Sequence, residues 1–216
     1  MKKEITVRGA ANVKVKPDYV NILINLVTYG KDYSDCMSDA AAKIQSLKNA
    51  LKAVAVDPED LRTTDFGVDT DWKTLADARG NYTKRVFKGY KVRQDLKFGF
   101  DFDRERLVTI LGAVAGSKVD PEFRVRFTVK DTSAVKEELF AKASENARKI
   151  AEGLCRGVGK TLGEIININY SWHEIDVYSE MLCDECPPPT GGGSVPDINP
   201  DDLGASDSVT FTWELI

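Results

Sequence analysis

Apolar residues recur at steps of three and four between residues 135 and 158, and this spacing predicts a long α-helix. The apolar positions are Val135, Leu139, Ala143, Ala147, Ile150, Ala151, Leu154 and Val158. On a helix of roughly six turns they form one stripe. Thr132 and Ser133 are suited to cap its start, and Gly157 and Gly159 are suited to its end. The alanines in the stripe would allow a neighbouring element to pack unusually close.

Apolar and polar residues alternate at both ends of the chain, which is typical of half-buried β-strands. The first alternation, over residues 5–15, is interrupted at Gly9-Ala10-Ala11-Asn12, so it predicts a strand with a kink or bulge. Residues 19–29 alternate next, and we expect these two strands to form a hairpin. Residues 208–216 predict a terminal strand.

Two further apolar stripes predict shorter helices. The first helix is expected over residues 36–54, with Ser34 or Asp35 as its cap. Its stripe consists of Ala40, Ile44, Leu47, Leu51 and Val54. The second helix is expected to start after Asp103 as its cap and to run through Ala115.

The middle of the chain predicts a long hairpin. Residues 61–72 alternate as a strand, the polar residues 73–81 are expected at the tip, and residues 82–102 form the returning strand. Gly89 and Gly99 are the expected bends in that strand. Further strands are expected at 123–129 and 162–178. The returning strand carries an aromatic series that we expect in the core, namely Tyr90, Phe98, Phe100 and Phe102.

Taken in order, these elements predict an α+β fold, with antiparallel-rich sheets and long helices packed on one face, in the order ββαββαβαββ. A chain of 216 residues is long for one compact domain and short for two, so we expect a single domain over residues 1–216 with two lobes. Residues 179–207 are acidic and rich in proline and glycine, and they predict a flexible insertion.

Composition limits the kinds of partner that the protein is expected to bind and the compartment in which it is expected. The net charge is −4 and the basic residues are interleaved with acids, which argues against nucleic acid as a partner. No window approaches the length of a transmembrane span. The N-terminus lacks the apolar region of a secretory signal, so the chain as it stands is expected in the cytoplasm. It would be periplasmic if a signal peptide has been removed.

The segment Gly157-Val158-Gly159-Lys160-Thr161 superficially resembles the end of a phosphate-binding P-loop. Its spacing does not fit, because Leu154 stands where the leading glycine should be. Its context does not fit either, since a P-loop connects a strand to a helix, and this segment is expected to leave a helix and enter a strand. We therefore interpret the glycines as a helix terminus.

The four cysteines are too few for a disulfide scaffold. Cys36 and Cys155 are expected to be inert, and Cys155 to be buried. Cys183 and Cys186 form a C-x-x-C pair, for which free thiols, a disulfide, a redox pair and half of a metal site all stay open. A zinc site would need His173 and the distant Cys36 as further ligands, and the two acids between the cysteines oppose a reactive thiolate.

No convergent set of catalytic, cofactor-binding or metal-ligating residues emerges from the sequence. His173 has no serine or cysteine nucleophile signature nearby. The paired acids Asp69 and Asp71, like Asp101 and Asp103, fall at strand ends and are expected to be solvated. We therefore predict no catalytic residue and no cofactor.

The order of these segments resembles the SIMPL family, known in bacteria from oxidative-stress-defence and periplasmic immunogenic proteins. The resemblance rests on Val7-Arg8-Gly9, Pro17-Asp18, Asp60-Leu61-Arg62-Thr63, Gly89-Tyr90-Lys91-Val92, the spaced alanines Ala143, Ala147 and Ala151, and Leu162-Gly163-Glu164-Ile165. Ala11 departs from the pattern, since it stands where the family usually has a second glycine. The resemblance implies an α+β fold, a tendency to form oligomers and no established catalytic residues.

Together, these observations favour a non-enzymatic protein that assembles with itself, binds a protein partner and is linked to the stress response. The alternative is a thiol- or metal-dependent stress sensor or ligand-binding protein that uses the Cys183/Cys186 loop. Neither interpretation includes nucleic acid or a transmembrane segment.

Overall fold

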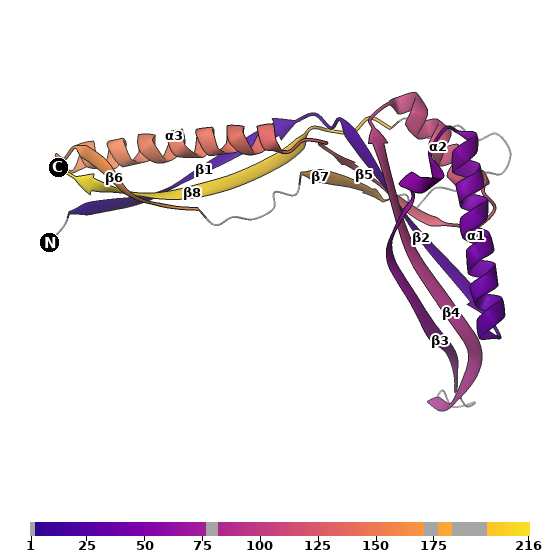
Figure 1. Ribbon diagram of the computed structural model, residues 1–216. Helices are drawn as coiled ribbons and strands as arrows, with labels where there is room; N and C mark the ends of the chain where they lie inside the picture. The colour runs from indigo at the N-terminus through magenta and orange to yellow at the C-terminus, as the bar shows by residue number, and fades with distance from the viewer. Residues whose placement is uncertain (1–2, 77–81, 171–176, 183–197) are drawn as a thin grey trace. The chain divides into compact units, whose positions relative to one another are not determined.

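The chain folds into two compact units, each with its own β-sheet. The computed structural model describes residues 3–76, 82–170, 177–182 and 198–216. The first unit comprises Met1–Asp18, Phe127–Ser179 and Pro200–Ile216, and the second comprises Tyr19–Arg126 and Glu180–Asn199. Helices pack on antiparallel sheets (Figure 1), which confirms the α+β class. The expectation that residues 1–216 form a single domain stays a prediction.

The sheet of the first unit has the strand order β1-β8-β6. Its strands are β1 (Glu4–Val15), β8 (Leu203–Leu215) and β6 (Leu162–Asn169). β1 and β8 pair along their whole lengths, from Glu4 opposite Glu214 to Val15 opposite Leu203, without a register shift. The kink or bulge expected at residues 9–12 is therefore wrong.

Helix α3 (Ser133–Gly157) lies over β1 and β8 (Figure 1). Its buried residues recur at every fourth position: Val135, Leu139, Ala143, Ala147, Ala151 and Cys155. A step of four residues advances about 40° past a full turn, so the buried line winds around the helix and can follow a twisted sheet. Ile150, Leu154 and Val158 fall outside this line and are 41%, 53% and 71% exposed, so their predicted place in the buried stripe is wrong.

Gly9 explains how closely this helix approaches the sheet. A Cβ atom at Gly9 would lie 2.0 Å from the carbonyl oxygen of Ala143 and 2.7 Å from the Cβ of Ala147. A strand and a helix can approach this closely only where both carry small residues. The interruption in the pattern of β1 therefore marks a packing contact instead of a kink, and the expected close approach at the alanines is confirmed.

The ends of α3 match the sequence analysis in part. Thr132 makes no capping hydrogen bond through its side chain. Instead, the backbone N–H of Ser133 donates to Oδ1 of Asp131 over 2.8 Å, and hydrogen bonding to Ser133 holds the pKa of that carboxyl below its usual value. Gly159 adopts a left-handed conformation with φ of +68° just after the helix, as expected for a helix end.

The second unit has a sheet with the order β3-β4-β2-β5-β7. Its strands are β2 (Tyr19–Gly30), β3 (Arg62–Ala76), β4 (Tyr82–Asp101), β5 (Glu122–Thr128) and β7 (Tyr178–Leu182). Its helices are α1 (Tyr33–Ala53) and α2 (Arg104–Gly116), with a short 3-10 helix η1 (Pro58–Asp60). The core of the unit is made of large side chains, among them Ile22, Ile24, Leu47, Leu96, Leu107 and Ile110.

The predicted hairpin of the first two strands is wrong. β1 pairs with β8, and β2 pairs with β4. Alternation gives each strand one apolar face but does not select its partner, and β8 matches β1 residue for residue over the full strand.

Three other expectations about strand boundaries change. The run at 162–178 divides into β6 and β7, which belong to different sheets, so the order contains one strand more than ββαββαβαββ. β3 continues to Ala76, into the expected hairpin tip, because pairing with β4 extends past Trp72. Strands also enter both ends of the predicted insertion 179–207, and residues 183–197 lie outside the described residues.

Of the two glycines expected to bend β4, only Gly89 lies at an irregularity of the strand. The pairing of β3 with β4 shifts register between Asp71 opposite Gly89 and Trp72 opposite Phe87, so Lys88 is the extra residue of a bulge. This confirms an irregularity at Gly89. Gly99 pairs with Asn21 in regular register, and a Cβ atom there would lie 2.6 Å from the Tyr19 ring, so this glycine makes room for Tyr19 instead.

Candidate functional site

The segment Gly157–Thr161 ends α3 and leads into β6, as the sequence analysis expected. Gly157 is the last residue of the helix, and the backbone N–H of Lys160 donates to the carbonyl oxygen of Cys155 over 2.9 Å. The glycines therefore terminate a helix here, and they do not open one as a phosphate-binding loop would.

Two of the four cysteines lie among the residues that the structure describes. Cys36 and Cys155 are buried free thiols, as expected for inert cysteines. Cys183, Cys186 and His173 lie outside the described residues, so the alternatives for the C-x-x-C pair stay open. The described part of the chain holds no group of three metal-ligating side chains.

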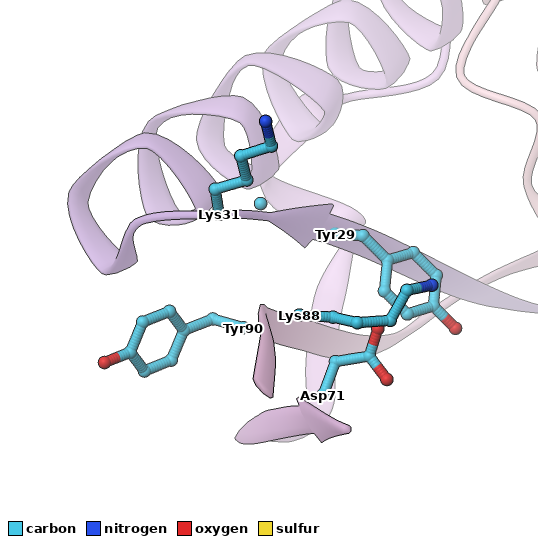
Figure 2. Close-up of a pocket in the computed structure, with 6 residues that line it drawn as sticks. Tyr29, Lys31, Asp71, Lys88 and Tyr90 are labelled. Carbon is cyan, nitrogen blue, oxygen red and sulfur yellow. The ribbon is translucent and has the colours of Figure 1, made fainter. Parts of the chain in front are cut away.

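The second unit contains a cleft of about 500 Å³ where β2 ends beside β3 and β4. We call it the pocket, and it is lined by Tyr29, Gly30, Lys31, Asp71, Lys88 and Tyr90. Figure 2 shows the side chains of Lys88 and Asp71 beside the Tyr29 ring, with Lys31 and Tyr90 pointing away from them.

Two glycines hold the backbones together at the base of the pocket. A Cβ atom at Gly89, where φ is +142°, would lie 2.1 Å from the carbonyl oxygen of Gly30. A Cβ atom at Gly30 would in turn lie 2.6 Å from the Cβ of Cys36. The Cys36 thiol is 3.5 Å from the carbonyl oxygens of Thr28 and Tyr90, which joins the start of α1 to both strands. The pocket is therefore built on a tight and well-defined base.

Positive charge predominates around the pocket. Lys31 and Lys88 line it together with one carboxylate, Asp71. A third ammonium group, that of Lys91, lies 5.7 Å from the centre of the Tyr29 ring. Two ammonium groups and one carboxylate line the pocket itself, which favours an anionic ligand.

A continuous aromatic row leads away from the pocket. It consists of Tyr33, Tyr90, Phe87 and Trp72, whose rings meet edge to face at centroid distances of 5.6, 5.5 and 5.3 Å in that order. The guanidinium of Arg85 lies 5.5 Å from the centre of the Trp72 ring. Tyr33, Phe87 and Trp72 are 53%, 44% and 44% exposed, and exposed apolar surface of this kind marks interaction sites.

The far end of the row lies on a two-stranded ribbon. β4 pairs with β2 only as far as Tyr90 opposite Gly30, whereas its pairing with β3 continues to Ala76 opposite Tyr82. We call residues 71–76 and 82–89 the arm. Figure 1 shows it extending from the end of the second unit.

A larger, open hollow lies on the face of the same sheet that the helices leave uncovered. Its volume is about 1020 Å³. The charged residues that line it are Lys91, Arg93, Asp95, Glu122 and Arg124. Since three basic and two acidic side chains are interspersed there, the lining does not single out a ligand class.

The sequence analysis missed the pocket and the row. Of the aromatic series expected in the core, Phe98 and Phe100 are buried, whereas Tyr90 and Phe102 are half-buried. Asp71, expected only to be solvated, lines the pocket. The available signal was a glycine within a strand, Gly89, flanked by lysine and tyrosine.

The first unit exposes apolar residues at both edges of its sheet. In the described part of this sheet, β6 is one edge and β1 is the other. β6 exposes Ile165, Ile166 and Ile168 by 54%, 44% and 55%. Ile165 and Ile168 lie opposite Trp213 and Phe211, so their side chains are on the face that carries α3.

The exposed residues of α3 border the other edge. Oδ1 of Asn146 accepts a hydrogen bond from the backbone N–H of Ala10 over 3.3 Å, which places this flank of the helix at the edge of β1. Ile150, Leu154 and Val158 follow Asn146 at steps of four, so they continue the same flank. Phe140, on the opposite flank, meets the Tyr170 ring just past β6 at 4.9 Å.

Comparison with known proteins identifies relatives without an assigned function. The model of the SIMPL family, described as a protein of unknown function (DUF541), matches residues 5–213. An uncharacterised protein of Edwardsiella ictaluri, named YggE, is 20% identical over 166 residues, which cover 77% of this chain and 67% of that protein. None of the described helices is both long enough and apolar enough to cross a membrane.

Proposed function

The chain belongs to the SIMPL family, whose function is unknown, and we propose that it is a non-enzymatic protein that assembles with copies of itself. The observation that carries this proposal is the pair of unlike apolar edges in the first unit. β6 is an edge strand whose eight residues include one charged residue, Glu164, and three exposed isoleucines. Such an edge favours pairing with another strand.

The β1 edge offers a complementary surface. Four helical residues advance about 6 Å, nearly the span of two strand residues, so Ile150, Leu154 and Val158 run along the first half of β1. The hydrogen bond from Ala10 to Asn146 occurs farther along β1. It therefore does not occupy the edge of the strand beside these three residues. A β6 strand from a second copy could pair here and extend the sheet.

In that arrangement each copy covers what the other leaves exposed. Ile165 and Ile168 of the added strand would lie beneath the helical flank formed by Ile150 and Leu154. Because two different edges meet, the contact is heterologous, and it generates a ring or an open filament.

The proposal includes binding of a protein partner, to which it assigns no surface. It assigns no catalytic residue. A link to the stress response is supported by the family resemblance alone.

The test is to disable each edge in turn and to measure molar mass by light scattering after size-exclusion chromatography. We expect oligomers of the unmodified chain and monomers of both the Ile165→Lys/Ile168→Lys variant and the Ile150→Glu/Leu154→Glu variant. Phe66→Lys, an exposed aromatic residue in the second unit, is the matched control and should leave the oligomer intact.

Mixing the two edge variants sharpens the test. Each retains one working edge, so a heterologous contact predicts dimers that contain one copy of each variant and grow no further. A monomeric unmodified chain, or oligomers that survive both sets of substitutions, would overturn the proposal.

A further inference from the structure

We propose that the arm and the pocket of the second unit bind an anionic phospholipid surface. This inference concerns a different part of the chain from the proposed self-association and does not depend on it. It rests on how apolar and basic side chains are distributed over the arm.

The arm exposes apolar side chains on both of its faces. Trp72 lies directly opposite Phe87 in the strand pairing, so these two side chains share one face. Val86 lies opposite Lys73 at the next position and belongs to the other face, where it is 38% exposed. A groove on a partner protein would cover one face of such a ribbon, whereas a layer of lipid headgroups surrounds it. The arrangement therefore favours a lipid surface as the occupant.

Charge points to the same occupant. Residues 71–76 and 82–91 contain five lysines and arginines and one aspartate, a local charge of +4 in a chain whose net charge is −4. Basic residues near a membrane are attracted to anionic lipids, and aromatic rings beside them are typical of the membrane interface. Arg85, stacked on Trp72, joins the two kinds of side chain.

The pocket supplies a site for the phosphate of a headgroup. It opens at the base of the arm, where Lys31 and Lys88 line a volume of about 500 Å³. Ammonium groups bind phosphate as point charges.

The experiment is co-sedimentation of the full chain with vesicles of phosphatidylcholine, with or without phosphatidylglycerol. We expect binding to the anionic vesicles that weakens as salt increases, and little binding to phosphatidylcholine alone. Trp72→Ala/Phe87→Ala and, separately, Arg85→Gln/Lys88→Gln should each weaken binding by about tenfold or more. Phe66→Ala and Lys97→Gln, which change an exposed aromatic and a basic residue outside the arm, are the matched controls. Circular dichroism checks that each variant is folded.

A second readout does not depend on substitutions in the arm. In a Trp172→Phe/Trp213→Phe chain, Trp72 is the remaining tryptophan, and its emission should shift to shorter wavelength on anionic vesicles and be quenched by brominated lipid. Inorganic phosphate at matched ionic strength distinguishes a free anion site from a lipid surface. The proposal is overturned if phosphate abolishes vesicle binding, if Trp72 emission does not change, or if single-stranded DNA or polyglutamate binds as tightly as the vesicles.

Discussion

The two units pack helices on sheets with side chains of very different size. In the first unit, the middle of α3 contacts the sheet through Ala143, Ala147 and Ala151 and lies directly on Gly9, while Val135 and Leu139 are buried nearer its start. In the second unit, Leu47 of α1 and Ile110 of α2 are fully buried, as are the isoleucines of β2 that contribute to the same core. The first contact is made by backbones that nearly touch, and the second by bulky side chains that fill a wider gap.

This difference determines which substitutions each unit can tolerate. A contact made of glycine and alanine has no room for an added atom, so it is sensitive to larger residues. A contact made of leucine and isoleucine loses packing and leaves a cavity when a side chain is shortened. Four predictions follow this contrast, in decreasing order of expected effect.

The largest effect is expected from shortening a buried side chain in the second unit. Leu47 is fully buried on α1, and Leu47→Ala should lower the free energy of unfolding by about 3 kcal/mol through lost burial and the cavity left behind. Leu154→Ala removes the same atoms from α3, where the side chain is 53% exposed in a single copy, and should have little effect at a protein concentration at which the chain is monomeric. Urea unfolding followed by circular dichroism measures both. If both substitutions lowered the free energy of unfolding equally, the difference in burial between the two leucines would not explain their contributions to stability.

The next effect is expected from adding a single carbon to the first unit. Gly9→Ala forces a methyl group against the Ala143 carbonyl and the Ala147 side chain, and should cost about 2 kcal/mol in the same measurement. Gly204→Ala is the control, because it lies in the same sheet and a Cβ atom there has no neighbour within 4 Å. If both substitutions are equally harmless, α3 does not lie as close to β1 as the structure places it.

These contrasts also show how much of the fold could be predicted from the sequence. Periodicity predicted all three long helices within a few residues, because each has one buried stripe. Asp103 was correctly predicted as the cap of α2, since its acceptor role depends on local geometry alone. In the aromatic series of β4, the expected burial was confirmed at Phe98 and Phe100.

Features that depend on distant residues were missed. Pairing of β1 with β8 joins opposite ends of the sequence, and nothing in the alternation of either strand specifies it. Ile150 and Leu154 are exposed because β1 is the edge strand of the described sheet beneath them, and the apolar pattern of the helix does not reveal where that edge lies. The pocket was equally hidden, because Tyr29, Asp71 and Lys88 meet only when three strands are aligned.

A third prediction concerns a partly buried polar contact in the first unit, for which the second unit offers an exposed control. The Tyr170 hydroxyl donates to Oδ2 of Asp207 over 3.0 Å, and Asp207 is only 6% exposed. Tyr170→Phe leaves that carboxylate with one donor fewer and should cost about 1.5 kcal/mol near neutral pH. Tyr33→Phe, which changes a 53% exposed ring in the second unit, should be close to neutral.

The same contact predicts a dependence on alkaline pH. Burial, followed by the hydrogen bond to Asp207, raises the pKa of Tyr170 above its ordinary value of 10.0. A raised pKa means that the protonated hydroxyl is favoured in the folded state. Its contribution is therefore complete below pH 10 and is lost as the pH rises through the higher folded pKa. Unfolding measured across this range should show a steeper loss for the unmodified chain than for Tyr170→Phe, and parallel curves would contradict the assignment.

The smallest effect is expected at the helix caps, where the two units again differ. In the second unit, Oδ1 of Asp103 accepts a hydrogen bond from the backbone N–H of Arg106 over 2.7 Å, so Asp103→Ala should cost about 1 kcal/mol. In the first unit, Thr132 occupies the same cap position on α3 and makes no such bond, since Asp131 accepts from the adjacent N–H of Ser133. Thr132→Ala should therefore change the unfolding free energy by much less than Asp103→Ala. Hydrogen exchange of the first-turn amides of both helices separates the two cases, because faster exchange is expected at Arg106 in one variant and unchanged exchange at Ser133 in the other. Equal losses would mean that cap position, and not the side-chain acceptor, sets the stability of these helix ends.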